Sequence, residues 1–268
     1  MTTAQTHAAS RNFLSRGQRG IRRYGWKGLL QESLMRCARP ALAPVAARHV
    51  RRRADQAVTI DDLLELTFEF QPFGIAMSPL QSPWEFRRLL EEVARIGPKA
   101  MLEIGTAKGG SLLAFTRLCA PNAHIVSVDL PRGPFGGGYP LWKMPLYAAF
   151  ARPGQRLDLV RGDSHSASTF AHVQNLLGGR KLDFLFIDGD HRYEGVQSDF
   201  ETYKSLMRPG GIIGFHDVAA PRPDRPLMNG NHPGDVPRFW ADLTKERPSQ
   251  TIVDPQGNGC FGIGLIRA

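Results

Sequence analysis

Residues 103–115 read EIGTAKGGSLLAF, in which the end of an apolar run is followed by glycines and then by a second apolar run. Glycines between a strand and a helix let backbone N–H groups approach a ligand closely, although they also occur in any tight strand–helix turn. The dinucleotide fingerprint G-x-G-x-x-G does not fit, because Ala107 replaces its second glycine. A Walker A loop does not fit either, because Lys108 precedes Gly109 and Gly110. The loop therefore disfavours a nicotinamide dehydrogenase and indicates a different ligand.

Short apolar runs alternate with helical segments around this loop. Strands are predicted at 101–104, 124–130, 157–160, 182–187 and 211–215. Residues 82–97 and 192–208 carry apolar residues at helical spacing, with Ser82 as the expected N-cap of the first of these helices. Two final runs, around 250–254 and at 261–266, flank PQGNG and predict a closing antiparallel hairpin. We therefore expect an α/β fold with a doubly wound, mostly parallel sheet of seven strands.

Composition and cysteine usage limit the class of protein. The chain has 268 residues, of which 42% are hydrophobic and 22% charged, as is usual for a globular protein. No apolar run approaches the roughly eighteen residues that span a bilayer, and the N-terminus has no apolar signal core. Cys37, Cys119 and Cys260 are widely spaced and form no C-x-x-C motif, which argues against disulfides and structural zinc. We expect a cytoplasmic protein.

The net charge of +9 is concentrated in an N-terminal arm, residues 1–56, which hold twelve Lys or Arg and two Asp or Glu. Residues 57–268 are close to neutral and are expected to form one globular domain. Part of the arm is expected to be disordered, with an amphipathic helical stripe from Trp26 to Met35 that Pro40 and Pro44 interrupt. Such an arm could bind an anionic membrane surface peripherally, or its helix could pack on its own domain or on the partner in a homo-oligomer. Binding to nucleic acid is not expected, because no aromatic residues lie among the arginines at 48–53.

Acidic residues end the predicted strands that follow the glycine loop. Asp129 ends the second strand about 24 residues after Gly105, where folds of this kind hydrogen-bond ribose hydroxyls. Asp163 and Ser164 end the third strand. A single acid at a strand end is commonly a helix cap, but capping alone does not explain three successive ends reading EIG, VDL and GDS. The pattern indicates a cofactor cleft.

The fourth and fifth strands end in IDGDH and GFHDV. In a doubly wound sheet these ends lie beside the topological switch point, so Asp188, His216 and Asp217 can converge there. Two carboxylates with an imidazole suit a divalent cation, Mg²⁺ or, if the imidazole is a ligand, Mn²⁺. Asp190 is expected to cap the helix that follows.

The pattern E-x-G-x-x-x-G-G-S resembles motif I of class I S-adenosylmethionine-dependent methyltransferases. Over roughly residues 75–268, the stretches EIGTAKGGS, PFGGGYP, FIDGDHRYEGV, GFHDV and VPRFW resemble metal-dependent O-methyltransferases of the catechol and caffeoyl-CoA type. They resemble more closely the antibiotic-sugar and macrolide O-methyltransferases and the cephalosporin hydroxylase family. The resemblance implies a Rossmann-like methyltransferase domain over 57–268, with S-adenosylmethionine and Mg²⁺ or Mn²⁺ as cofactors.

The resemblance also implies roles for individual residues. The cofactor site would comprise Glu103, Gly105, Thr106, Gly109, Ser111, Asp129, Asp163 and Ser164, of which the last two would contact the edge of the adenine ring. The metal site would comprise Asp188, His216 and Asp217, where His216 stands in a position that often holds an acid in the relatives. His191 would be the catalytic base, since an imidazole accepts a proton near neutral pH. The implied reaction is methylation of a hydroxyl on a sugar or a secondary metabolite, with a small molecule or a glycan as the acceptor.

Two alternatives stay open. A metal-independent methyltransferase would use Asp188 and Asp217 to position the acceptor directly. A non-catalytic protein with a cofactor-binding fold would act through its basic arm.

Two segments outside the motifs could contact ligands. The insertion at 131–154, with Phe135, Tyr139 and Trp142, is either an aromatic lid or a structural excursion with inward-facing rings. Residues 219–235 form a loop where acceptor specificity would be set.

Overall fold

A seven-stranded sheet forms the centre of the protein in the computed structural model, which describes residues 34, 37–133, 138, 140–221, 233–245, 247–257 and 261–268. The strands are β1 (Ala100–Ile104), β2 (His124–Asp129), β3 (Arg156–Arg161), β4 (Leu182–Ile187), β5 (Met207–Ala219), β6 (Ser249–Ile252) and β7 (Phe261–Arg267). They lie in the order β3-β2-β1-β4-β5-β7-β6, and the first five pair in parallel. β7 is antiparallel to both of its neighbours. The predicted doubly wound sheet with a closing hairpin is confirmed, and its order reverses between β1 and β4.

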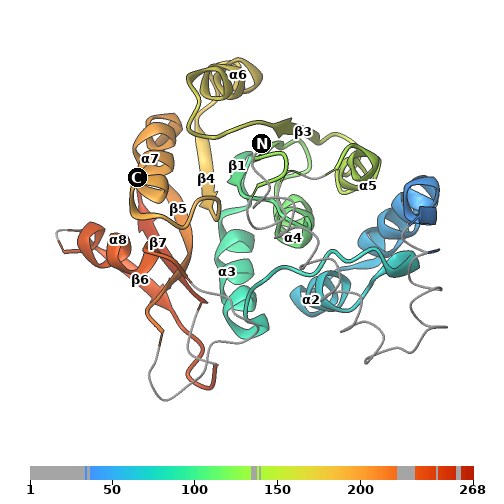
Figure 1. The fold of residues 1–268 in the computed structure, drawn as a ribbon, viewed down its shortest axis with the longest axis horizontal. Coiled ribbons are helices and arrows are strands. Elements are labelled where there is room, and N and C mark those ends of the chain that lie inside the picture. The colour runs from blue at the N-terminus through green and yellow to red at the C-terminus, as the bar shows by residue number, and fades with distance from the viewer. Residues whose placement is uncertain are drawn as a thin grey trace, which may run out of the picture.

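Helices cover both faces of the sheet (Figure 1). One face packs against α2 (Ile60–Phe68), α3 (Pro83–Ile96) and α4 (Gly110–Leu118), and the other packs against α6 (Ala167–Leu177), α7 (Tyr193–Tyr203) and α8 (Val236–Leu243). Because neighbouring side chains on a strand point to opposite faces, Met101 joins the first layer and Leu102 the second. This arrangement explains why the central parallel strands β1, β2 and β4 are mostly apolar and buried, unlike the edge strand β3.

The boundaries of two helices differ in detail from the predictions. Ser82 lies at the N-cap of α3 as expected, but its hydroxyl donates to Asp254 Oδ2 at 3.1 Å and does not cap the helix. α7 ends at Tyr203, is followed by η3 (Lys204–Leu206), and gives way to β5 at Met207, so the predicted helix to residue 208 is wrong at its C-terminal end. Met207 pairs with Leu182, and the shift in register that follows absorbs the RPGG sequence within the strand.

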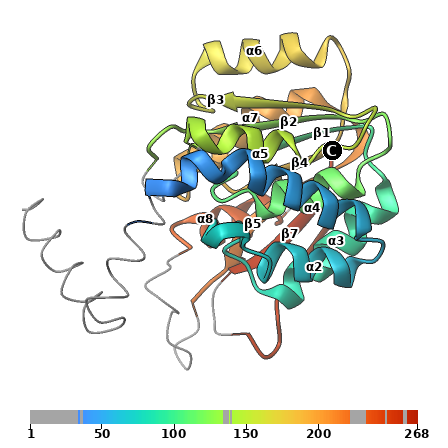
Figure 2. The ribbon, with the colours of Figure 1, turned by 90° about the vertical axis from the view of Figure 1, so that its right-hand side faces the viewer.

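The N-terminal helix, residues 37–56, packs on the same layer as α2 and α4 (Figure 2, blue). Small apolar residues at helical spacing are buried along it: Ala43, Ala46, Ala47, Val50 and Ala54. Asp55 also pairs with Arg117 of α4 at 2.9 Å. Pro40 and Pro44 do not interrupt this helix, so that expectation is wrong; the buried face keeps the segment helical. The Trp26–Met35 stripe lies almost wholly outside the described residues, and the boundary at residue 56 and the membrane-binding role stay predictions.

If this helix is part of the domain core, Val50→Ala should lower the free energy of unfolding by about 2 kcal/mol, because Val50 is fully buried. The melting temperature should fall by about 5 °C. Val58→Ala is the matched control, since Val58 is 89% exposed and should change stability by less than about 0.5 kcal/mol. Equal melting temperatures for the two variants would show that the helix does not contribute to the fold.

The insertion between β2 and β3 is packed where the structure describes it. It contains η2 (Leu141–Lys143) and α5 (Met144–Ala148), from which Leu146 and Tyr147 enter the core together with Phe150. Trp142 packs against the same cluster. This favours the structural excursion for residues 140–154, whereas Phe135 and Tyr139 lie outside the described residues. No helix in the described ranges is long and apolar enough to cross a membrane.

Candidate active site

The glycine loop after β1 lies against the end of β4. Gly105 has φ +89°, and its N–H donates to the carbonyl of Val128 at 2.9 Å. A Cβ on Gly105 would lie 2.0 Å from the carbonyl oxygen of Asp188, a separation that no side chain can occupy. Glycine is therefore required both by the backbone conformation and by the close approach of two strand ends.

Asp129, predicted to bind ribose, shapes the glycine loop in this structure. Its Oδ2 accepts the backbone N–H groups of Thr106, at 3.2 Å, and Ala107, at 2.7 Å. Ala107 has φ +46°, which L-residues rarely adopt, so these bonds help to hold a strained turn. Burial raises the pKa of Asp129, although the backbone N–H groups around it oppose that effect.

Neighbouring protein groups explain why positions 109 and 110 hold glycine. A Cβ on Gly109 would lie 2.4 Å from the ring of Tyr147, and one on Gly110 would lie 2.4 Å from the carbonyl of Met77. Tyr147 also donates its hydroxyl to the carbonyl of Ala107 at 3.3 Å. The insertion therefore supports the loop from behind, a role that sequence reasoning missed because Tyr147 lies 40 residues away in an unrelated segment.

Glu103 is fully buried at the end of β1. Burial raises its pKa to about 8, while the Ser111 and Thr106 hydroxyls act in the opposite direction. Glu103 is therefore mostly protonated at neutral pH, and it lies behind the loop, outside the walls of both cavities described next.

Two cavities meet at the carboxyl ends of the strands. The first, about 480 Å³, is lined by residues that include Asp129, Asp163, Ser164 and His165. The second, about 530 Å³, is lined by residues that include Ser78, Thr106, Ser111, His216, Asp217 and Phe261. Gly105, Ala107, Asp188, Gly189, Asp190 and Arg192 line both cavities. The predicted cofactor residues thus divide between two connected spaces, and Gly109 and Glu103 line neither.

A strained backbone brings consecutive residues of β5 to one site. Neighbouring strand residues normally face opposite sides of a sheet, but Asp217 has φ +61° and the pairing with β7 shifts register between His216 and Ala219. Both the imidazole of His216 and the carboxylate of Asp217 can therefore lie near the carboxylate of Asp188, which directly follows β4. Left-handed residues and bulges of this kind are common at functional sites.

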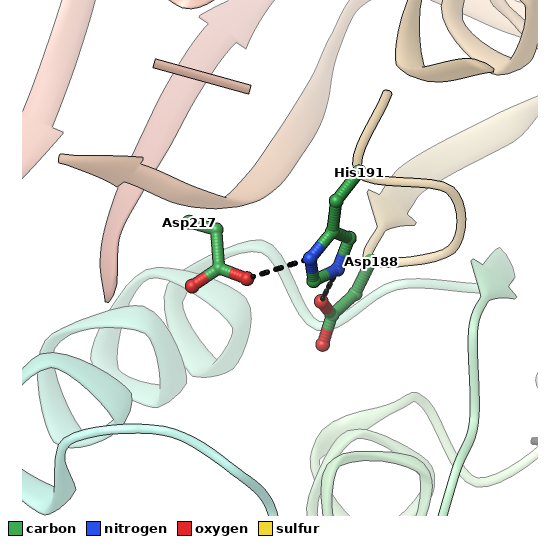
Figure 3. A group of neighbouring side chains, drawn as sticks. All are labelled: Asp188, His191 and Asp217. Carbon is green, nitrogen blue, oxygen red and sulfur yellow. Dashed lines mark ion pairs between the residues drawn. The ribbon is translucent and has the colours of Figure 1, made fainter. Parts of the chain in front are cut away.

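His191 lies between the two carboxylates (Figure 3). Its Nε2 is 3.5 Å from Asp188 Oδ1 and its Nδ1 is 3.2 Å from Asp217 Oδ2. Donor atoms of Asp188, His191 and Asp217 all lie within 4.8 Å of one another. His216 Nδ1 is 3.0 Å from Asp188 Oδ1 and 3.4 Å from Asp217 Oδ2. The predicted residues converge, and the geometry makes His191, which the sequence suggested as the base, a potential third ligand.

The charges in this group compensate one another. Burial alone would raise the pKa of Asp188, but His216 and His191 hold it well below its usual value. Burial would lower the pKa of His191 and of His216, yet the facing carboxylates raise both, that of His216 most strongly. Two carboxylates and an imidazole are also a donor set that suits Mg²⁺ or Mn²⁺. The residues present therefore fit a divalent cation.

Asp190 has a separate, structural role. It accepts the backbone N–H of Arg192, at the N-cap of α7, at 2.9 Å, and also pairs with the Arg192 guanidinium. Gly195 of α7 leaves room for this carboxylate, because a Cβ there would lie 2.3 Å from Asp190 Cγ. The expectation that Asp190 caps the helix is therefore wrong: Arg192 is the N-cap of α7, no side chain caps that helix, and Asp190 closes the turn that precedes it.

Comparisons with known proteins relate part of the chain to methyltransferases. Residues 102–218 match a family model described as a methyltransferase domain. The O-methyltransferase TomG of Streptomyces achromogenes, solved in complex with SAM, has a similar fold, with a TM-score of 0.51 and 18% identity over 80% of this chain and 94% of TomG. Residues 102–218 thus match a methyltransferase domain, and the similarity to TomG shows that the chain has the fold of that O-methyltransferase, as the sequence predicted.

Its relatives by sequence include O-methyltransferases. Caffeoyl-CoA O-methyltransferase 2 of Zea mays is 25% identical over 213 residues, covering 75% of this chain and 71% of the maize protein. An uncharacterised mimivirus protein, R132, is 33% identical over 135 residues, 48% of this chain and 57% of that protein. An uncharacterised Sinorhizobium fredii protein, y4gI, is 25% identical over 170 residues, which is 62% of this chain but only 17% of that protein. This chain therefore spans only part of the length of some relatives.

Proposed function

We propose that this protein transfers the methyl group of S-adenosylmethionine to a hydroxyl of a small molecule or glycan with the help of a divalent cation. The proposal rests chiefly on one observation: the two cavities meet at Asp188, beside His191 and Asp217. The relationship to caffeoyl-CoA O-methyltransferases supports oxygen as the methylated atom.

We assign the first cavity, which is lined by Asp129, Asp163 and Ser164, to the nucleoside of the cofactor. The second cavity, which includes Phe261 and Leu80, is assigned to the acceptor. Because Asp188 lines both cavities, an acceptor hydroxyl held beside it would lie next to the cofactor. Methyl transfer then depends mainly on alignment of oxygen, carbon and sulfur, which binding in two fixed spaces provides.

The two carboxylates of Asp188 and Asp217, with His191 adjacent, would hold Mg²⁺ or Mn²⁺. A bound cation would lower the pKa of the acceptor hydroxyl. Of the two imidazoles, His191 has a 17% exposed side chain and His216 a 3% exposed one. We therefore assign the role of proton acceptor to His191, and we assign to His216 the positioning of the Asp188 carboxylate through its 3.0 Å contact.

Treatment with EDTA should reduce turnover by at least about 100-fold, and Mg²⁺ or Mn²⁺ should restore it, because the cation contributes several kcal/mol to catalysis. Turnover is measured as release of S-adenosylhomocysteine with a panel of catechols, sugars and nucleotide sugars. The calorimetric affinity for S-adenosylhomocysteine should stay within a few-fold in EDTA. Absence of binding by the untreated protein would refute the proposed cofactor.

A metal-independent methyltransferase is the second candidate. It is favoured by the ion pairs through which His191 and His216 already neutralise both carboxylates. In that case, EDTA leaves turnover unchanged with the same acceptors, and Asp188 orients the acceptor hydroxyl directly.

A further inference from the structure

Glu85, in the first turn of α3, is a buried carboxylate that the site described above does not use. Its Oε1 accepts the backbone N–H of Asp254 at 2.8 Å, and its Oε2 accepts the backbone N–H of Gly262 at 2.9 Å. Burying a carboxylate is costly unless hydrogen bonds compensate it. Asp254 follows β6 and Gly262 belongs to β7, so this one side chain joins α3 to both strands of the closing hairpin.

Gly262 lies opposite the irregularity in the pairing of β5 with β7. The pairing shifts register between His216 and Ala219, so that two residues of β5 lie opposite Gly262 alone. Gly262 has φ +77°, and a Cβ there would lie 2.8 Å from Ala219 Cβ. A bulge of this kind disrupts the regular ladder of hydrogen bonds. The Glu85 carboxylate therefore supplies a hydrogen-bond acceptor at the point where the ladder is irregular.

Phe261 is the residue that precedes Gly262 in this irregular segment. Its φ of +91° is one that L-residues rarely adopt, so the surrounding contacts must hold its backbone in place. Its ring stacks on the imidazole of His216, with the ring centroids 5.7 Å apart and an angle of 25° between the planes. Phe261 also lines the cavity assigned to the acceptor. The position of its ring in the cavity wall therefore depends on the backbone that Glu85 holds.

Two further interactions connect Glu85 and its partners with the site. Ser82, at the N-cap of α3, donates its hydroxyl to Asp254 Oδ2 at 3.1 Å, so α3 anchors this end of the hairpin twice. Burial raises the pKa of Glu85, and the two backbone N–H groups and the positive charge of His216 oppose that effect. The anchor on α3 thus lies close enough to the acceptor cavity for His216 to act on its charge.

We propose that Glu85 is a positioning residue for the acceptor: by holding the backbone at Gly262, it fixes the ring of Phe261 in the wall of the acceptor cavity. Phe261 is then the residue that touches the acceptor and determines how well the acceptor fits. This inference rests on the proposed function, because it requires the acceptor in this cavity. Glu85 itself contacts neither the acceptor nor the cofactor, so its substitution should affect acceptor binding through Phe261 alone.

Steady-state kinetics on the full chain, with the most active acceptor of the panel of catechols, sugars and nucleotide sugars, test the proposal. In Glu85→Gln, one of the two backbone N–H groups faces an amide NH₂ group, which cannot accept a hydrogen bond, and this end of the hairpin loosens. The KM for the acceptor should rise about tenfold, because the contact with the aromatic ring is lost. The kcat and the calorimetric affinity for S-adenosylhomocysteine should stay within about threefold of the wild type. Phe261→Leu should show the same pattern.

A double-mutant cycle separates this role from a purely structural one. Because Glu85 acts through Phe261, the double variant Glu85→Gln/Phe261→Leu should have the KM of Phe261→Leu alone. Val50→Ala is the control for lost stability, since it should lower the melting temperature and keep the wild-type KM. Glu91→Gln is the control for a lost carboxylate on α3: Glu91 pairs with Arg88, and the variant should behave as the wild type.

The outcomes of the cycle distinguish the inference from the proposed function. If Glu85→Gln does not fold, Glu85→Asp replaces it in the cycle, because the shorter side chain keeps the charge but cannot reach both N–H groups. If the wild type is active and either Phe261→Leu keeps the wild-type KM or the two effects add, the inference is wrong and the proposed function stands. If the wild type neither binds S-adenosylhomocysteine nor releases it with any acceptor of the panel, both are wrong.

Discussion

Replacing Asp188 by Asn should lower kcat/KM by about 1,000-fold while changing the affinity for S-adenosylhomocysteine only a few-fold. Asparagine keeps the size of the side chain but removes the charge that faces His191 and His216. If the cation contributes several kcal/mol to catalysis through this carboxylate, loss of that contribution corresponds to a decrease in kcat/KM of about three powers of ten. Asp217→Asn should have a similar effect, and the double variant should be little worse than either single one, because both carboxylates act through one cation.

Asp183→Asn is the control for this experiment. Asp183 lies near the opposite end of β4, where it accepts the backbone N–H groups of Lys99 and Ala100 and pairs with Arg208. Its loss should lower the melting temperature and leave kcat/KM of the folded protein near that of the wild type. A wild-type kcat/KM in Asp188→Asn would remove the basis for both proposed mechanisms, since one assigns this carboxylate to the cation and the other assigns it to the acceptor hydroxyl.

The sequence predicted the fold because parallel strands buried on both faces leave a simple signal. Apolar runs such as 182–187 have few other structural explanations, and the residue that follows each run lies at the ligand-binding edge. The convergence of Asp188 and Asp217 could thus be predicted from strand ends alone, and the structure brings them together around His191.

Contacts between distant segments could not be predicted. Nothing in the local pattern around Gly109 indicates that Tyr147 packs against it, or that Asp199 pairs with His165. The left-handed Asp217 also lies in an irregularity of the pairing between β5 and β7, a strand that begins over 40 residues later. The spacing of apolar residues indicates which face of a helix or strand is buried. It does not indicate which distant segment packs against that face, and the contacts of Gly109 and Asp199 and the conformation of Asp217 depend on such segments.

Gly105→Ala should destabilise the protein severely and abolish cofactor binding. Its φ of +89° costs an L-residue about 1–2 kcal/mol. The added methyl carbon would lie 2.0 Å from the Asp188 carbonyl oxygen, so β1 and β4 must separate, and overpacking of this kind costs about 1–3 kcal/mol or more. The free energy of unfolding should therefore fall by about 2–5 kcal/mol, and the melting temperature by about 10 °C.

Gly178→Ala isolates the steric part of this effect. Gly178 also has positive φ, +56°, at the C-cap of α6, but a Cβ there would meet no atom within 4 Å. The free energy of unfolding of Gly178→Ala should be only about 1–2 kcal/mol below that of the wild type. This variant should bind S-adenosylhomocysteine as the wild type does. Asp188 lies directly against Gly105. Separation of β1 and β4 in the Gly105→Ala variant would therefore also displace Asp188, the acid that lines both cavities. A folded Gly105→Ala protein with wild-type affinity and turnover would show that the close approach of the strand ends does not position the site.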